Sequence, residues 1–207
     1  MDGFNVNSTY IAADTTAADA DGVAQSQTPA AGGAQSLTLN GAETSGGVAT
    51  FTAARRVTVT SAGDDRGRTF TITGTDVHGD AQTEVISGPN AALTTGTSYF
   101  RTVTDVTVDA NTAGAVTVGM SNDALDVVFK GRMRIRGLYV VNSAAAGTLP
   151  FRNTSASGDT ILTFGTVASA TTVSEFIIPG RGVLFPAGCY LAYTAGTTVF
   201  TSATVFY

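Results

Sequence analysis

Side chains alternate in character at every second residue over long stretches of this chain. Residues 56–61 read Arg-Val-Thr-Val-Thr-Ser, and residues 68–75 read Arg-Thr-Phe-Thr-Ile-Thr-Gly-Thr. A period of two places successive side chains on opposite faces of a strand and does not fit the 3.6-residue repeat of a helix. The 35 Thr and 21 Val support the same prediction, because β-branched residues favour strands. No stretch has the spacing of an amphipathic helix. The chain is predicted to be all-β.

Turn residues divide the chain into three predicted parts. Residues 1–33 are rich in Ala, Asp, Gly and Gln and lack a steady period, which predicts an extended N-terminal arm or a disordered terminus. Residues 34–125 hold about seven strand candidates, including a hairpin expected at Asn40-Gly41. Residues 126–207 hold a second series, whose longest strand is expected at residues 132–142. We therefore predict two successive small β-sandwich units, jelly-roll or Ig-like, after the arm.

Charge is sparse and unevenly distributed along the chain. Only 13% of the residues are charged, about half the usual quarter, and the net charge is -5. Residues 1–125 carry 13 acidic residues and five arginines, a net -8, whereas residues 126–207 carry three acidic and six basic residues, a net +3. This balance argues against general nucleic-acid binding. The change of sign indicates a domain boundary or two different partners.

Four basic residues follow one another at a period of two, namely Lys130, Arg132, Arg134 and Arg136. In a strand they would project from one face, with Phe129, Gly131, Met133 and Ile135 on the other. Three interpretations remain open at this point. The basic residues could protect a solvated edge strand from aggregation. They could instead dock onto an acidic protein surface, or contact nucleic acid, although few aromatic residues lie between them.

Few residues suited to catalysis or to metal and cofactor binding are present. His78 is the only histidine and Cys189 the only cysteine, which excludes a disulfide framework and a four-ligand zinc site. Asp76 and Asp80 flank His78, and this segment is expected to be a hairpin turn whose Asp side chains bond the backbone. We predict no enzyme activity, no cofactor and no metal. No apolar run has the length of a membrane-spanning helix, and no secretory signal is evident.

Aromatic and aliphatic residues gather at both ends of the chain. Phe4, Tyr10 and Ile11 form an apolar cluster near the start, and Phe206 and Tyr207 form the last two residues of the sequence. An arm that is ordered would have to be held by a neighbour, and terminal aromatic residues are expected in a sheet or a subunit interface. These five residues are therefore predicted to make oligomer or arm contacts.

Several short segments in the first part of the chain are distinctive, namely Gln25–Ala30, Leu37–Gly41, Gly47–Thr50, Arg55–Asp65, Thr69–Asp76 and Gln82–Glu84. Through these segments, roughly residues 20–120 resemble a family of structural proteins from virions of tailed bacteriophages. Through Gly137–Asn142 and the ending Val205–Tyr207, residues 135–207 are similar to small β domains of phage particle proteins.

The resemblance implies a non-enzymatic component of the phage virion, assembled in the host cytoplasm. The leading expectation is a capsid decoration (cement) protein, a homotrimer that binds the major capsid protein, with no sequence-specific nucleic acid and no membrane as partners. A neck, collar, tail or fibre-attachment subunit is the first alternative. A module that binds host-surface glycans through Tyr99, Tyr190 and Tyr193 is the second, although the absence of Trp weakens it.

Overall fold

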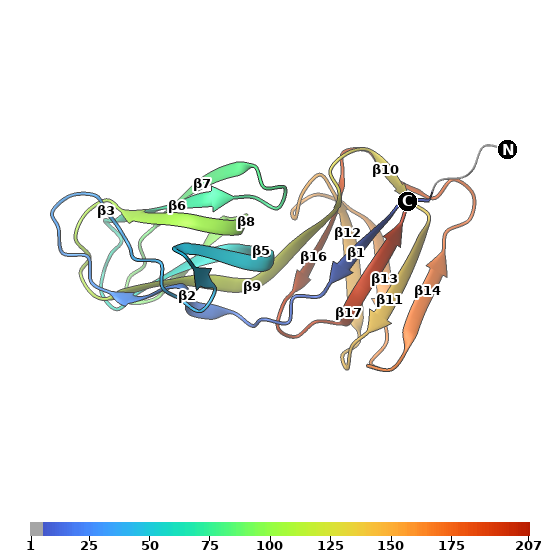
Figure 1. The fold of residues 1–207 in the computed structure, drawn as a ribbon, viewed down its shortest axis with the longest axis horizontal. Coiled ribbons are helices and arrows are strands. Elements are labelled where there is room, and N and C mark those ends of the chain that lie inside the picture. The colour runs from blue at the N-terminus through green and yellow to red at the C-terminus, as the bar shows by residue number, and fades with distance from the viewer. Residues whose placement is uncertain (1–5) are drawn as a thin grey trace. The chain divides into compact units, whose positions relative to one another are not determined.

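The computed structural model describes residues 6–207, and these residues form strands and no helix (Figure 1). The all-β prediction is confirmed. Within the same residues no helix is long and apolar enough to cross a membrane. By its internal contacts the chain divides into two compact units. We call residues 17–124 the central unit, and residues 6–16 together with 125–207 the terminal unit.

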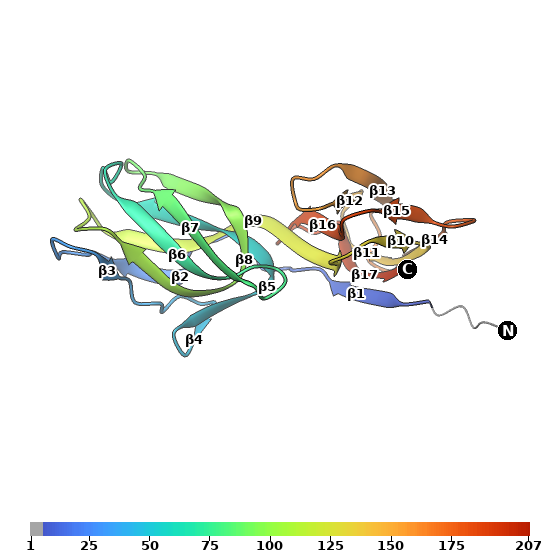
Figure 2. The ribbon, with the colours of Figure 1, turned by 90° about the horizontal axis from the view of Figure 1, so that it is seen from above.

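Strands of the central unit are long and antiparallel. Five of them lie in the order β9-β5-β8-β6-β7, while β2 pairs with β9, β3 with β8 and β4 with β5. Figure 2 shows β8, β6 and β7 side by side, with β7 at the edge of this sheet. The strands are β2 (Asp19–Gln27), β3 (Gln35–Ser36), β4 (Thr44–Ser45), β5 (Val48–Ser61), β6 (Thr69–Thr75), β7 (Ala81–Ser87), β8 (Leu93–Val108) and β9 (Val116–Phe129).

Alternation along these strands produces the core of the central unit, as the sequence predicted. In β6, Phe70 and Ile72 are fully buried, while Thr71 between them and Thr69 and Thr73 on either side are exposed or partly exposed. They pack in one apolar cluster with residues such as Phe51 and Phe100 from β5 and β8. Burying a large apolar side chain of this kind stabilises a fold by about 2 kcal/mol, so this cluster accounts for the unit's compactness.

The first hairpin of the central unit lies later than expected. Ser45 pairs with Val48, so the two-residue loop is Gly46-Gly47 rather than Asn40-Gly41. Both glycines have positive φ, at 61° and 80°, which is the backbone that a type I′ turn requires. Asn40 instead accepts a 2.9 Å hydrogen bond at Oδ1 from the backbone N–H of Gln25.

Two sheets of the terminal unit enclose a second core. One sheet has the order β1-β17-β11-β14, and the other runs β13-β12-β16, with β16 beside β9, while β10 and β15 form a separate pair. Leu138, Val140 and Val205 from the first sheet meet Phe151 and Leu191 from the second. The strands are β1 (Ser8–Ala12), β10 (Met133–Ile135), β11 (Gly137–Asn142), β12 (Gly147–Asn153), β13 (Thr160–Thr166), β14 (Val173–Ile177), β15 (Val183–Phe185), β16 (Cys189–Thr194) and β17 (Phe200–Phe206).

Residues 6–33 do not form the separate arm that was expected. β1 pairs with β17 in the terminal unit, and β2 pairs with β9 in the central unit. The segment is therefore held by its own chain and needs no neighbouring subunit to be ordered. The division between the units falls after Ala124, one residue before the expected boundary, and β9 contains it.

Candidate docking site

The basic residues at 130–136 are placed by a short strand rather than by a long one. The expected strand over residues 132–142 is divided into β10 and β11, and Arg136 lies between them. Lys130 and Arg132 lie in the bend that follows β9, so only Arg134 belongs to a strand. Side chains still alternate between exposed and buried over residues 132–136. Met133 and Ile135 are buried, while the three arginines are exposed or half-buried.

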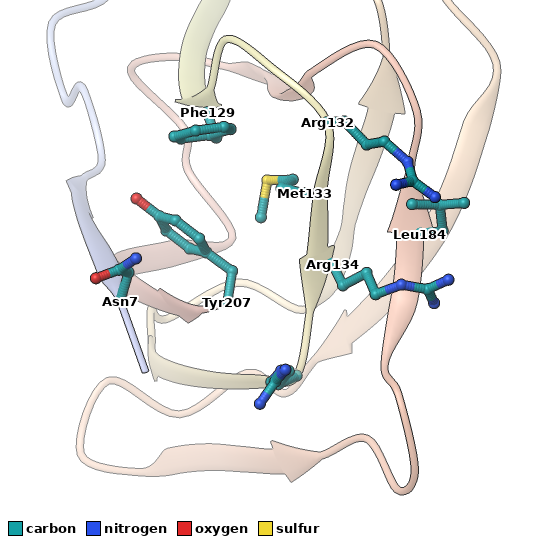
Figure 3. A pocket seen from close by; sticks show the side chains of 8 residues that line it. Asn7, Phe129, Arg132, Met133, Arg134, Leu184 and Tyr207 are labelled. Atoms are coloured by element: carbon teal, nitrogen blue, oxygen red, sulfur yellow. The ribbon is translucent and has the colours of Figure 1, made fainter. Parts of the chain in front are cut away.

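A pocket of about 360 Å³ includes all three arginines in its lining. Figure 3 shows Arg132 and Arg134 extending on the side of β10 that carries Leu184, with Phe129 and Tyr207 on the other side of the strand. The lining therefore has a cationic half and an aromatic half. The complete lining is Asn7, Phe129, Arg132, Met133, Arg134, Arg136, Leu184 and Tyr207.

Backbone pairing holds the aromatic half in place. Asn7 and Tyr207 exchange two backbone hydrogen bonds of 2.9 and 2.8 Å, which extend the β1–β17 ladder by one pair. The ring centroids of Tyr207 and Phe129 are 5.4 Å apart, and the Tyr207 hydroxyl lies 3.3 Å from Thr9 Oγ1. Phe129 was predicted on the face opposite the basic residues, and Figure 3 shows it on the other side of β10 from Arg132 and Arg134. It ends β9 41% exposed and lines the same pocket.

The β10–β15 pair positions the cationic half. Arg134 lies opposite Leu184 in register, and its Nη1 donates a 3.1 Å hydrogen bond to the carbonyl of Gly182. Gly182 has φ of +72°, and a Cβ there would clash with the carbonyl oxygen of Ile135, so glycine is required at this position. Arg134 is thereby fixed by the turn before β15.

Within residues 6–207, Arg132, Arg134 and Arg136 form no ion pair with a carboxylate. Guanidinium groups bind carboxylates and phosphates with paired N–H donors, and the pairing is strongest where water is partly excluded. Three such groups beside one pocket therefore make an anion-binding surface. Lys130 is exposed in the preceding bend and does not line the pocket, so the predicted stripe of four becomes a cluster of three, which we call the arginine cluster.

The five predicted oligomer contacts divide among different environments. Tyr10 is 67% exposed, and Phe206 is half-buried on the same face of the four-stranded sheet. Ile11 points into the core of its own unit, so it offers no surface to another subunit. Tyr207 is half-buried in the pocket, and Phe4 lies outside the described residues.

His78 lies in a hairpin turn, as the sequence predicted. Asp76 Oδ1 accepts hydrogen bonds from the backbone N–H groups of His78 and Asp80 at 2.8 and 3.0 Å, and this closes the turn between β6 and β7. Across the described part of the chain, no three His, Cys, Asp or Glu side chains are grouped closely enough to hold a metal ion. The Asp76 carboxylate thus stabilises the turn by accepting backbone hydrogen bonds.

Other singled-out residues also have structural partners. Cys189 is fully buried, and this burial raises the pKa of its thiol. Tyr190 is only 6% exposed and so cannot stack on a sugar ring as the glycan-binding alternative requires. The Tyr193 hydroxyl donates a 2.9 Å hydrogen bond to Asp126 Oδ2 and accepts one of 3.1 Å from the backbone N–H of Asp14.

Two adjacent aspartates in the central unit have different roles. Asp64 is exposed and pairs with Arg66 through contacts of 2.9 and 2.7 Å, which lower the pKa of Asp64 to about 2. Asp65 is 1% exposed and accepts hydrogen bonds from Ser61 Oγ at 2.5 Å and from the backbone N–H of Ala113 at 2.7 Å. From its buried position Asp65 therefore links the end of β5 to the loop before β9.

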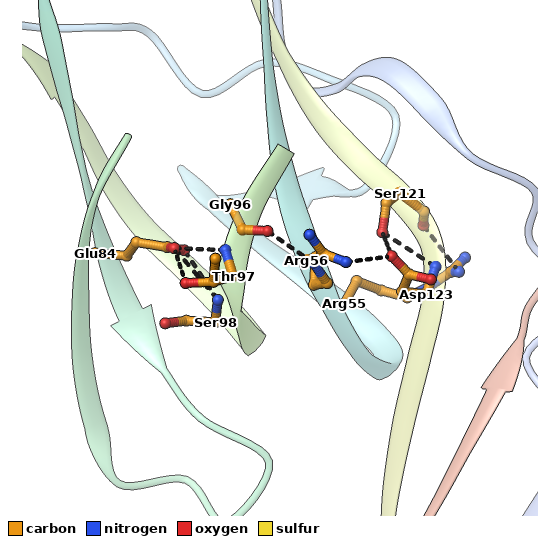
Figure 4. A network of polar contacts seen from close by, with 8 residues as sticks. All are labelled: Arg55, Arg56, Glu84, Gly96, Thr97, Ser98, Ser121 and Asp123. Carbon is orange, nitrogen blue, oxygen red and sulfur yellow. Dashed lines mark hydrogen bonds and ion pairs between the residues drawn. The ribbon is translucent and has the colours of Figure 1, made fainter. Parts of the chain in front are cut away.

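Polar contacts among β5, β7, β8 and β9 were not predicted at all (Figure 4). Arg55 is fully buried and donates from Nη1 to the Ser121 carbonyl at 3.1 Å, while Arg56 pairs with Asp123 at 2.9 Å. Glu84 accepts hydrogen bonds from the backbone N–H and the hydroxyl of Thr97 at 2.6 and 2.8 Å. A charged pair inside an otherwise alternating strand was the one signal available, since Arg55 and Arg56 interrupt the Thr and Val pattern.

In comparisons with known proteins, no protein-family model, no curated protein and no solved structure matches this chain.

Proposed function

We propose that this chain is a structural protein of a phage virion, which binds the major capsid protein and stabilises the shell. The arginine cluster carries the proposal, because three guanidinium groups line one pocket and no described carboxylate pairs with them. Like charges this close repel one another, and an acidic surface on a partner would relieve the repulsion. The function requires binding and no catalysis.

Electrostatic docking fits the low charge of the rest of the chain. With few other charges to compete, the arginine cluster would set the orientation of docking and the rate of encounter. A protein that binds the assembled shell and not its free subunits stabilises the shell by mass action. Each bound copy would then raise the resistance of the head to internal pressure from DNA.

The number of copies per particle tests this function. A quantitative gel of purified virions whose genome encodes the chain is expected to show a copy number comparable to that of the major capsid protein. A copy number that fits a single ring at one vertex would contradict decoration and favour the neck or collar alternative. Absence of the chain from purified virions would contradict both.

The glycan-binding alternative has a separate test. Among its three tyrosines, Tyr190 is buried and the Tyr193 hydroxyl is bonded to Asp126, so this alternative has lost structural support. Binding of the isolated protein on a glycan array would restore it, and the expected result is no binding.

A further inference from the structure

The four-stranded sheet of the terminal unit ends in an uncovered strand on each side. Its order is β1-β17-β11-β14, so β1 and β14 each have one ladder partner. Exposed edge strands are normally protected by Lys, Pro or bulges. β1 reads Ser-Thr-Tyr-Ile-Ala and β14 reads Val-Ser-Glu-Phe-Ile, so Glu175 is the single charged residue on the two edges.

Each edge presents the backbone groups of three residues to a further strand. Asn7 and Ala13 bond to β17, so Ser8, Tyr10 and Ala12 between them direct N–H and C=O groups away from it. On the other side, Thr172 and Ile178 bond to β11. The outward-directed residues of β14 are therefore Val173, Glu175 and Ile177.

The two edges match each other in direction and in register. Alternating antiparallel pairing makes β1 antiparallel to β14, and three rows of residues cross the sheet from one edge to the other. Ser8 is in the row of Ile177, Tyr10 in the row of Glu175, and Ala12 in the row of Val173. A second sheet placed beside the first would continue every row.

We propose that this sheet is a self-association surface, in which β1 of one copy pairs with β14 of the next. The pairs are Ser8 with Ile177, Tyr10 with Glu175 and Ala12 with Val173 of the second copy. Each pair exchanges two hydrogen bonds, so all outward-directed groups of both strands are satisfied. The Tyr10 hydroxyl gains Glu175, the one charged residue on these edges, as a cross-strand neighbour.

A symmetric dimer, in which two copies pair through the same edge strand, fits the two open edges less well. β1 against β1 would leave β14 uncovered, and β14 against β14 would place two Glu175 carboxylates opposite each other, which is destabilising. Head-to-tail pairing covers both edges with one contact and closes into a ring when the rotation permits.

The exposed outer face of the sheet supports association between copies. Residues with side chains on this face include Tyr10 at 67%, Ile177 at 74% and Tyr139 at 40% exposure. Two five-residue strands form a contact smaller than the roughly 800 Å² per partner of a stable interface. The apolar outer faces must therefore contribute, and a ring that turns them toward a common axis buries them.

Engineered disulfides test the register. Paired residues in this arrangement have Cα atoms about 5.5 Å apart, within the range that a disulfide spans. Oxidised S8C/I177C protein is expected to form covalent multimers on a non-reducing gel. The matched control S8C/V173C places the two thiols about 14 Å apart along the strands and should not cross-link. The native thiol of Cys189 is buried and does not interfere.

Equal cross-linking of both double variants, or of neither, would overturn the proposal. A disulfide-linked dimer of Y10C would also overturn it, because only β1 against β1 brings two copies of residue 10 together.

A proline substitution tests the strand pairing without cysteine chemistry. The N–H of Tyr10 points away from β17, so Tyr10→Pro removes a donor at the open edge and leaves the β1–β17 ladder bonds intact. The wild-type protein is expected to sediment as an oligomer and the variant to dissociate at least tenfold more readily.

Val85→Pro is the matched control for this substitution. Val85 is 61% exposed on edge strand β7, and its N–H also points away from the neighbouring strand. This variant should stay oligomeric. A monomeric wild type, or equal association of both variants, would overturn the proposal. The homotrimer expected from the sequence is one ring that this contact can build, and the measured mass gives the number of copies in the ring. The self-association does not depend on the capsid role.

Discussion

The backbone N–H of Arg136 donates a 2.8 Å hydrogen bond to the carbonyl of Phe206. This bond ties the arginine cluster to the last strand, β17, which in turn is paired along its length with β1. Residues near both ends of the chain therefore support the position of Arg136. Arg134 in β10 and Arg136 through this bond are thereby anchored to paired strands, which hold a residue more rigidly than an isolated loop does.

Removal of the Asp65 side chain should destabilise the central unit. Asp65→Ala leaves the Ser61 hydroxyl and the Ala113 N–H without their acceptor in a buried site. The expected loss in the free energy of unfolding is about 3 kcal/mol, measured by urea denaturation. Asp64→Ala, one residue away on the surface, is the control and should leave the urea midpoint nearly unchanged. Equal losses in the two variants would contradict this assignment.

Acid titration should show a lower pKa for Asp64 than for an ordinary aspartate. The Arg66 side chain lowers the pKa of Asp64 to about 2 from its usual 3.8. A lowered pKa stabilises the fold above pH 3.8, but this contribution is small because water screens the exposed Asp64–Arg66 pair, and it is lost as the pH falls through about 2. Carboxyl NMR of the wild type should show this low midpoint, and Arg66→Gln should return it towards 3.8. An unchanged midpoint in the variant would show that Arg66 is not the cause.

Tyr193 should make the terminal unit sensitive to alkali. Burial, followed by the nearby charge of Asp126, raises the pKa of Tyr193. A raised pKa contributes stability below the unfolded value of about 10, and the contribution is lost as the pH rises above it. Tyr193→Phe should cost about 2 kcal/mol at neutral pH through the lost hydrogen bonds.

The same variant should lose less stability than the wild type between neutral and alkaline pH. Denaturant midpoints at the two pH values measure the difference. A parallel decline of both proteins would mean that the hydroxyl contacts of Tyr193 with Asp126 and Asp14 contribute nothing to this pH dependence.

Local patterns in the sequence predicted local structure well. The alternation around Met133 and Ile135 gave the buried and exposed sides of β10, and the Asp76 turn was placed correctly. These features depend on neighbouring residues, whose geometry the period of the chain determines.

Features that depend on distant residues were not predicted. Pairing of β1 with β17 joins residues almost two hundred positions apart, and no local pattern in residues 6–33 identifies that partner. The buried Arg55 depends on the carbonyl of Ser121 in another strand. The break at Arg136 depends on β10 and β11 pairing with different strands, β15 for one and β14 and β17 for the other. Tertiary contacts, rather than propensity, decided these points.

Docking through the arginine cluster is tested most directly by co-sedimentation with empty phage heads. The variant R132E/R134E/R136E reverses the cluster, and R66E/R68E/R181E is a control with the same change in net charge at other arginines. Circular dichroism first establishes that both variants fold. The account predicts that the wild type and the control sediment with the heads, and that the cluster variant stays in the supernatant. Undiminished binding of the cluster variant, or equal loss in both variants, would contradict it.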